Sequence, residues 1–215
     1  MFDFVYFLFE VAAFVVALFQ IGKLKHSIYI YFIPYLIYVL FYEVATIYNL
    51  FSINHSNLWV TNINMTISFL FYGFFLSAII KTPVFKKWIK RLIYLSIFCS
   101  VIDMAFIQGF WKLDSITILL QYGIIILINC IYFYELMNYT ETELVVIKLP
   151  GFWLNTGLLF YCLSQFLVFS AFAYMAYKGS EEYRILFDMV GNMAYTIFYL
   201  CLTLAFLCPH KTTKL

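Results

Sequence analysis

The chain has 215 residues, of which 65% are hydrophobic and only 11% are charged, and its mean hydropathy is +0.93. Soluble domains have about 25% charged residues, so this composition predicts a membrane protein and excludes a soluble domain. The net charge of +2 comes from short clusters beside the apolar runs. Nucleic-acid-binding proteins present a basic face that this chain lacks, so nucleic acid is not expected as a partner.

Apolar runs of about 20 residues, the length that crosses a bilayer, follow one another along the whole sequence. In chain order they predict membrane-spanning helices at 3–21, 28–49, 61–80, 91–110, 115–136, 151–177 and 185–207. The gaps between these runs are short and leave no room for a soluble domain. The sequence therefore predicts an all-α membrane fold, one seven-transmembrane-helix bundle that occupies residues 1–215. A six-span alternative places 61–80 or 185–207 along the membrane surface, but it splits the basic clusters across the membrane.

The distribution of Lys and Arg predicts the orientation, because cytoplasmic loops hold the excess of these residues. Of the 13 Lys and Arg residues, all but three fall on one side of the predicted spans. The three exceptions are Lys112, Lys178 and Arg184. The N-terminus is therefore expected outside and the C-terminus in the cytoplasm. The tryptophans agree with this orientation, since they then lie at the two membrane interfaces, the outer one for Trp59 and Trp111 and the inner one for Trp88 and Trp153.

Polar and small residues recur at helical spacing in several predicted spans, which places them on one face of each helix. In the first span this stripe comprises Asp3, Tyr6, Glu10, Ala13, Ala17 and Gln20, and we expect it to face other helices. In the second span the stripe comprises Tyr31, Tyr35, Tyr38 and Tyr42, with Glu43 beside the last of them. The tyrosine row is either an interhelical hydrogen-bonding seam or ring packing.

Strong polarity is concentrated at one predicted depth. The outer half of the bilayer holds most of the polar residues of the spans, which are Glu10, Glu43, Asp103, Gln108, Gln121, Asp188 and Asn192. The inner half has little beyond Asn129 and Glu135. This pattern predicts a polar pocket that opens to the outside. Its expected ligand- or cation-binding residues are Glu10, Glu43, Asp103, Asp188 and Asn192, and its expected lining residues are Tyr42, Gln121 and Tyr195.

The expected pocket has no basic partner, because no Lys or Arg lies within a span beside Glu10, Glu43 or Asp103. Carboxylates in a medium of low dielectric constant either take up protons or meet a cation. One interpretation is a site for a cation or a small cationic ligand, or a group that reports pH through shared protons. The other is that each acid is a protonated hydrogen-bonding spacer.

The sequence lacks the motifs of several well-known classes of enzymes and ligand-binding proteins. Retinal proteins need a lysine in the last span, and none lies between Ile185 and Leu207. Metalloprotease, nucleophile-elbow, nucleotide-binding and EF-hand patterns are also missing from the sequence. The five cysteines and three histidines show no metal-ligand spacing. We therefore expect no enzyme activity, no cofactor and no bound metal.

Two segments, LPGFWLNTGLLFYCLSQFLVF at 149–169 and NMAYTIFYLCLTLAFLCPHK at 192–211, resemble an uncharacterised seven-helix membrane domain family of Bacteroidota. The family pattern at the start of the sixth span is matched by Pro150, Phe152, Trp153, Gly157 and Tyr161. Members of that family look like stand-alone proteins or like the input module of sensor histidine kinases. The resemblance implies a multi-pass protein of the bacterial inner membrane. Since this chain stops at Leu215, a kinase is expected to be a separate polypeptide.

These observations predict a receptor-like or sensory module that binds a ligand outside. It is expected to act on a cytoplasmic signalling partner through the loops at 81–91 and 137–150. A small transporter or ion pathway is one alternative, and it predicts polar residues that continue to the inner side, such as Asn129 and Glu135. A structural or accessory membrane subunit without a ligand is the other alternative.

Overall fold

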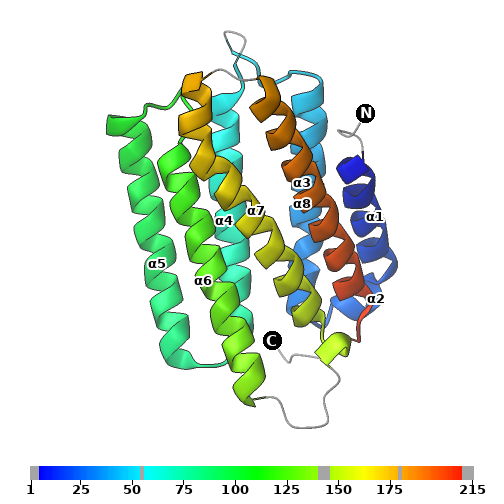
Figure 1. The fold of residues 1–215 in the computed structure, drawn as a ribbon. Coiled ribbons are helices and arrows are strands. Elements are labelled where there is room, and N and C mark those ends of the chain that lie inside the picture. The colour runs from blue at the N-terminus through cyan, green and yellow to red at the C-terminus, as the bar shows by residue number, and fades with distance from the viewer. Residues whose placement is uncertain (1–4, 54–55, 140–145, 179–180, 210–215) are drawn as a thin grey trace. The chain divides into compact units, whose positions relative to one another are not determined.

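The computed structural model describes residues 5–53, 56–139, 146–178 and 181–209, and these residues are almost entirely helical (Figure 1). In chain order the elements are α1 (Val5–Phe19), α2 (Ile21–Leu24), the 3-10 helix η2 (Ile28–Tyr31), α3 (Phe32–Ile47), α4 (Leu58–Ile79), α5 (Pro83–Ile102), the π-helical turn η3 (Asp103–Ile107), α6 (Ser115–Tyr139), the 3-10 helix η4 (Val146–Lys148), α7 (Pro150–Lys178) and α8 (Glu181–Leu207). Within the described part of the chain, β-structure is limited to an isolated bridge between Ile53 and Ser56. Asp3 and residues 140–145 lie outside the described residues.

Five helical segments are long and apolar enough to cross a membrane, and they indicate a multi-pass membrane protein that contacts the lipid bilayer. They are Ile28–Ile47, Leu58–Ile79, Ser115–Asn138, Pro150–Ala171 and Asp188–Leu207. Of the other two predicted spans, α1 is a shorter apolar helix, and α5 has four basic residues in its first half, at positions 86, 87, 90 and 91. The all-helical class is confirmed. The count of seven spans and the orientation of the termini stay predictions.

The chain divides into two compact units. Unit 1 comprises Met1–Leu40 and Leu136–Leu215, and unit 2 comprises Phe41–Glu135. Unit 1 thus contains α1, the first part of α3, α7 and α8, whereas unit 2 contains the end of α3, α4, α5 and most of α6. A single domain over 1–215 stays a prediction.

In unit 1, α8 packs against both α1 and α7. The helices α7 and α8 come close together at Gly157 of α7, where a Cβ atom would lie only 2.6 Å from Cβ of Cys201 on α8. On α1, Glu10, Ala13 and Ala17 are completely buried, which confirms that this face of the helix is turned toward other helices. Small residues at such positions let helix backbones come close together in a membrane.

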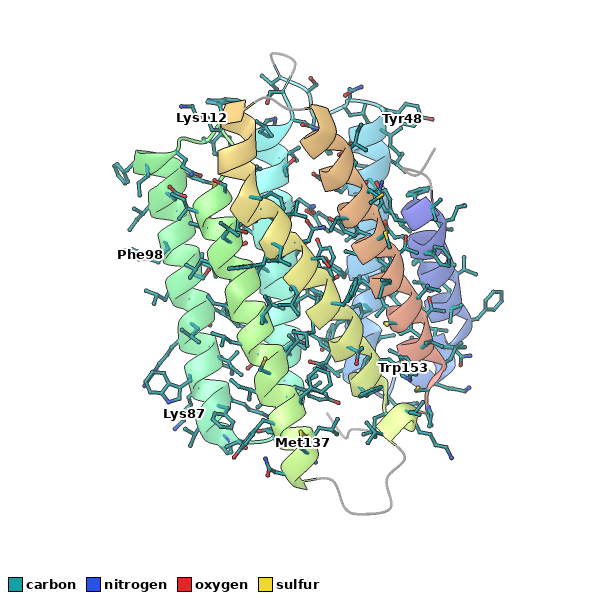
Figure 2. All side chains as sticks on the ribbon, in the orientation of Figure 1. Tyr48, Lys87, Phe98, Lys112, Met137 and Trp153 are labelled. Carbon is teal, nitrogen blue, oxygen red and sulfur yellow. The ribbon has the colours of Figure 1, made fainter. Side chains whose placement is uncertain are left out.

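In unit 2, α5 begins at Pro83, eight residues before the predicted start at 91. Proline suits the first turn of a helix because the N–H that it lacks has no partner within the helix there. The two N–H groups just before it are bound by Glu135 of α6, whose carboxylate accepts hydrogen bonds from Lys81 N at 2.7 Å and Thr82 N at 2.9 Å. The basic residues after Pro83 therefore lie on α5 and not in a loop. Lys87 and Lys112 lie at opposite ends of this unit (Figure 2).

Candidate functional site

Unit 1 contains a group of polar and aromatic side chains on α1, α7 and α8, which we call the tyrosine–glutamate cluster. Its members are Tyr6, Glu10, Tyr161, Gln165, Asn192 and Tyr195. The ring of Tyr195 lies 5.5 Å from that of Tyr6 and 4.8 Å from that of Tyr161, measured between centroids. The Tyr161 hydroxyl also donates a hydrogen bond to the Tyr195 hydroxyl at 3.0 Å. Tyr195 therefore joins all three helices.

The other members of the tyrosine–glutamate cluster lie one helical turn from these rings. Glu10 follows Tyr6 by four residues on α1 and is completely buried. Gln165 follows Tyr161 by four residues on α7, is also buried, and has its amide nitrogen against Gly191 of α8. Asn192 is the next residue of α8 and is half-buried. The cluster thus combines a carboxyl group, two amides and three phenol rings, and none of its members is basic.

Unit 2 contains a second group, which we call the acid-pair cluster, at the junction of α4, α5 and α6. Its members are Asn62, Ser100, Asp103, Asp114 and Thr117, and all five are buried. Asp114 caps the N-terminus of α6, because its carboxylate accepts a hydrogen bond from Thr117 N at 3.4 Å. It also accepts a hydrogen bond from the Ser100 hydroxyl at 3.1 Å. Asn62 holds the preceding loop, donating to the Lys112 carbonyl at 2.7 Å and accepting from Asp114 N at 3.0 Å.

Asp103 enters the acid-pair cluster through the π-helical turn that ends α5, which closes with a hydrogen bond from Gln108 N to the Asp103 carbonyl at 3.0 Å. Its side chain is 2% exposed, and its two carboxyl oxygens accept no hydrogen bond from any residue that the structure describes. The Asp114 carboxyl lies close enough to act on it by hydrogen bonding and by charge. The cluster therefore contains two adjacent buried acids.

The sequence-predicted site residues are divided equally between the two units. Glu10, Asp188, Asn192 and Tyr195 belong to unit 1, and Tyr42, Glu43, Asp103 and Gln121 belong to unit 2. Gln121 is buried, Glu43 is half-buried, and the Tyr42 hydroxyl lies 3.3 Å from that of Thr61. Asp188 is exposed. Glu10, Asn192 and Tyr195 share one cluster, and a single pocket that unites all eight residues stays a prediction.

Of the acid-pair cluster, Asp103 alone was among the predicted site residues, and the other four members, Asn62, Ser100, Asp114 and Thr117, were not. Asp114 precedes the apolar run at 115–136, and an aspartate just before such a run is a typical helix N-cap, so its capping role was visible in the sequence. The position of Asp114 in the cluster could not be predicted in this way. The residues that hydrogen-bond to it, Ser100 and Asn62, lie 14 and 52 residues away along the chain.

The polar residues predicted for the inner half have structural roles. Asn129 donates a hydrogen bond from its amide to the Ile125 carbonyl one turn earlier on α6, at 2.8 Å. Glu135 caps the N-terminus of α5, as described above. A helix cap and an intrahelical bond account for these two side chains without an ion pathway.

No known protein family, curated protein or solved structure matches this chain. The resemblance to the Bacteroidota domain family therefore stays an expectation. Its sequence pattern nevertheless has a clear structural basis. Pro150 begins α7, the Trp153 indole donates to the Ile147 carbonyl at 2.7 Å, and Gly157 allows the close approach of α8.

Proposed function

We propose that this multi-pass membrane protein is a receptor-like sensory module of the bacterial inner membrane. It binds a small cationic ligand at the tyrosine–glutamate cluster and acts on a separate cytoplasmic partner. The main support for this proposal is that Glu10 is completely buried and lies four residues from Tyr6 on the same helix. The ring of Tyr6 contacts the ring of Tyr195, which in turn contacts the ring of Tyr161. An acid in this setting is costly, so a functional role is the default interpretation.

The chemistry of the cluster favours a cation. Tyrosine faces attract ammonium and guanidinium groups, by about 2 kcal/mol or more when these are removed from water, and a carboxylate adds a full opposite charge. The α1 helix, Val5–Phe19, has no Lys or Arg that would neutralise Glu10 from its own helix. A ligand with one ammonium group would bring a positive charge to this carboxyl group and these rings.

The α7 and α8 pair offers a route from the cluster to the other end of unit 1. Tyr161 and Tyr195 lie on these two helices, and Gly157, one turn from Tyr161, is pressed against Cys201. Further along, the Ile147 carbonyl accepts hydrogen bonds from the Trp153 indole and, at 3.7 Å, from the Cys208 thiol. Closely packed helices move as rigid elements. A change at the tyrosine pair is thereby passed toward the loop at 137–150, where the partner is expected to bind.

The two alternative functions, a transporter and an accessory subunit, have different structural requirements. A transporter needs a polar path through the inner half, and the capping role of Glu135 and the intrahelical bond of Asn129 leave that alternative without specific support. An accessory subunit needs no ligand and tolerates a change of Glu10 to its amide.

A ligand screen on the purified full-length protein in nanodiscs tests the proposal. The probes are a panel of primary, secondary and quaternary amines, and the readout is the unfolding temperature. A ligand that binds only the folded state raises this temperature. At a concentration 100 times its Kd, such a ligand adds about 2.7 kcal/mol to the free energy of unfolding. We expect at least one amine to stabilise the parent protein and not the Glu10→Gln variant.

The matched control is Glu143→Gln, the same change of acid to amide at a position between α6 and α7 in the sequence. This variant should respond to the amine as the parent protein does. Stabilisation that survives Glu10→Gln contradicts the proposed site. A complete lack of response across the amine panel, with Glu10→Gln as stable as the parent protein, favours the accessory role.

A further inference from the structure

We propose that Asp103 and Asp114 form a proton-binding site, in which one proton is shared between the two carboxyl groups and joins the end of α5 to the start of α6. The site lies wholly within unit 2 and does not depend on the proposed function of the tyrosine–glutamate cluster.

Asp114 is the member of the pair that carries the negative charge. Its carboxylate accepts hydrogen bonds from the Ser100 hydroxyl and from Thr117 N, and it lies at the N-terminus of the 25-residue helix α6. The N-terminus of a helix carries a partial positive charge and binds carboxylates. The Ser100 hydroxyl is in turn held 3.3 Å from the Thr117 hydroxyl. These groups together hold the Asp114 carboxyl group in place.

Asp103 has no such support. Both of its carboxyl oxygens are buried and receive no hydrogen bond within the described part of the chain, while the Asp114 carboxyl faces it. Two ionised carboxylates side by side in a buried position repel each other strongly, so one of the pair takes up a proton. A hydrogen bond between two carboxyl groups also requires a proton on one of them. A protonated Asp103 that donates to Asp114 meets both conditions.

Within the described part of unit 2, the groups hydrogen-bonded to the pair carry no positive charge. The groups that face the pair are the Ser100 hydroxyl from α5, the Thr117 hydroxyl from α6 and the Asn62 amide from α4, all of them neutral. Gln108, at the end of the π-helical turn, is also neutral and donates its side-chain amide to Ser115. Lys112 is the one basic residue between Arg91 and Lys148 in the sequence, and its side chain is exposed. A proton is therefore the positive charge that is available to the two carboxyl groups.

The shared proton has a structural consequence. While it is present, the π-helical turn that carries Asp103 is tied to the N-cap of α6. When a rise in pH removes it, the turn and the cap each carry a negative charge and repel each other. Short π-helical turns of this kind are frequent at functional sites, where they re-aim a side chain. The contact between α5 and α6 should therefore weaken as the pH rises.

Infrared difference spectroscopy of the full-length protein in nanodiscs, recorded while the pH is raised, tests the site. The signal is the carbonyl stretch of a protonated carboxyl group. In the parent protein we expect one component of this band to disappear as the pH rises, together with a fall in the unfolding temperature. In Asp103→Asn this component should be missing and the unfolding temperature should no longer change over that pH range, because the amide donates to Asp114 at every pH.

A second variant keeps the test decisive if Asp103→Asn does not fold. Asp114→Asn preserves the N-cap, since asparagine caps helices as well as aspartate does, but it removes the charge that holds the proton. In this variant the component should disappear at a lower pH than in the parent protein. Glu143→Gln is the control and should leave the component unchanged.

Three results would overturn the proposal. One is a band component and a pH-dependent unfolding temperature that both persist in Asp103→Asn. Another is an Asp114→Asn variant whose component disappears at the same pH as that of the parent protein. The third is restoration of the high unfolding temperature, at a pH where the component has disappeared, by sodium chloride and not by choline chloride, in the parent protein and not in Asp103→Asn, because a metal cation would then occupy the place assigned to the proton.

Discussion

The two units hold their helices together by different means. In unit 1 the helices α7 and α8 contact each other away from their ends. Gly157 has no side chain and lets α8 come close, and Tyr161 contacts Tyr195 through its ring and its hydroxyl. In unit 2 several of the described polar contacts lie at helix ends, where Glu135 caps α5 and Asp114 caps α6. Unit 1 should therefore be sensitive to changes in side-chain volume, and unit 2 to changes in hydrogen bonding and charge.

A pair of glycine substitutions gives the largest expected difference between the units. In Gly157→Ala the new methyl group meets Cβ of Cys201 at 2.6 Å and Cα of Phe198 at 3.4 Å, so the helices themselves must move apart. We expect this change to lower the free energy of unfolding by about 3 kcal/mol, the upper part of the usual range for overpacking. Reversible unfolding in mixed detergent micelles measures it.

The matched control is Gly73→Ala in unit 2. Its new methyl group meets only the end of the Ile93 side chain, at 2.9 Å, and that end can turn away. We expect a loss below about 1 kcal/mol. Equal losses for the two glycine variants would show that the contact between α7 and α8 is no tighter than that between α4 and α5.

The cap of α5 gives the next largest effect. Glu135→Ala leaves the N–H groups of Lys81 and Thr82 without the carboxylate that now accepts their hydrogen bonds. We expect a loss of about 2 kcal/mol in the free energy of unfolding, the cost of leaving part-buried donors unsatisfied. Hydrogen exchange of the first turn of α5 should increase in the same variant. Glu143→Ala is the control, and a loss as large as that of Glu135→Ala would contradict the capping role.

The cap of α6 should contribute less. Asp114→Ala removes the bonds from Thr117 N and the Ser100 hydroxyl, and we expect it to lower the free energy of unfolding by about 1 kcal/mol. Asp114→Asn, measured at acidic pH, should keep most of that stability because asparagine also caps helices. If the two variants are equally unstable there, the capping interaction is not what Asp114 contributes.

The hydroxyl pair of unit 1 should have the smallest effect. The bond between Tyr161 and Tyr195 is a side-chain hydrogen bond between helices, which is worth about 0.6 kcal/mol on average in a membrane protein. A double-mutant cycle of Tyr161→Phe and Tyr195→Phe should give a coupling energy of this size. Coupling well above about 2 kcal/mol would mean that the hydroxyls belong to a larger hydrogen-bond network.

Local periodicity was enough to predict much of the fold. The stripe of the first span needed only steps of three and four residues, and Glu10, Ala13 and Ala17 are indeed buried. Helices also form at all seven predicted apolar runs, although five of the helical segments meet the length and composition of a membrane span. The start of α5 was predicted wrongly, because its basic residues look like a loop. The cap that determines this start, Glu135, lies 54 residues away from Lys81.

The candidate site was harder to predict for the same reason. Glu10, Asn192 and Tyr195 were selected by depth and polarity, and Tyr195 joins three helices through rings that no spacing rule connects. Asp103 was selected as an intramembrane acid. Its neighbour Asp114 was passed over because it lies between two apolar runs, and the pair exists only through the turn that brings α5 back to α6.

Direct binding of an amine tests the central claim about the tyrosine–glutamate cluster. Isothermal titration of an amine identified by its stabilising effect should give a measurable Kd for the full-length parent protein and for Glu143→Gln. For Glu10→Gln the account predicts a Kd at least about tenfold higher, equivalent to about 1.4 kcal/mol, because the buried carboxylate no longer opposes the ligand charge. A Kd that is the same in Glu10→Gln and in the parent protein would contradict the claim that Glu10 binds the cation.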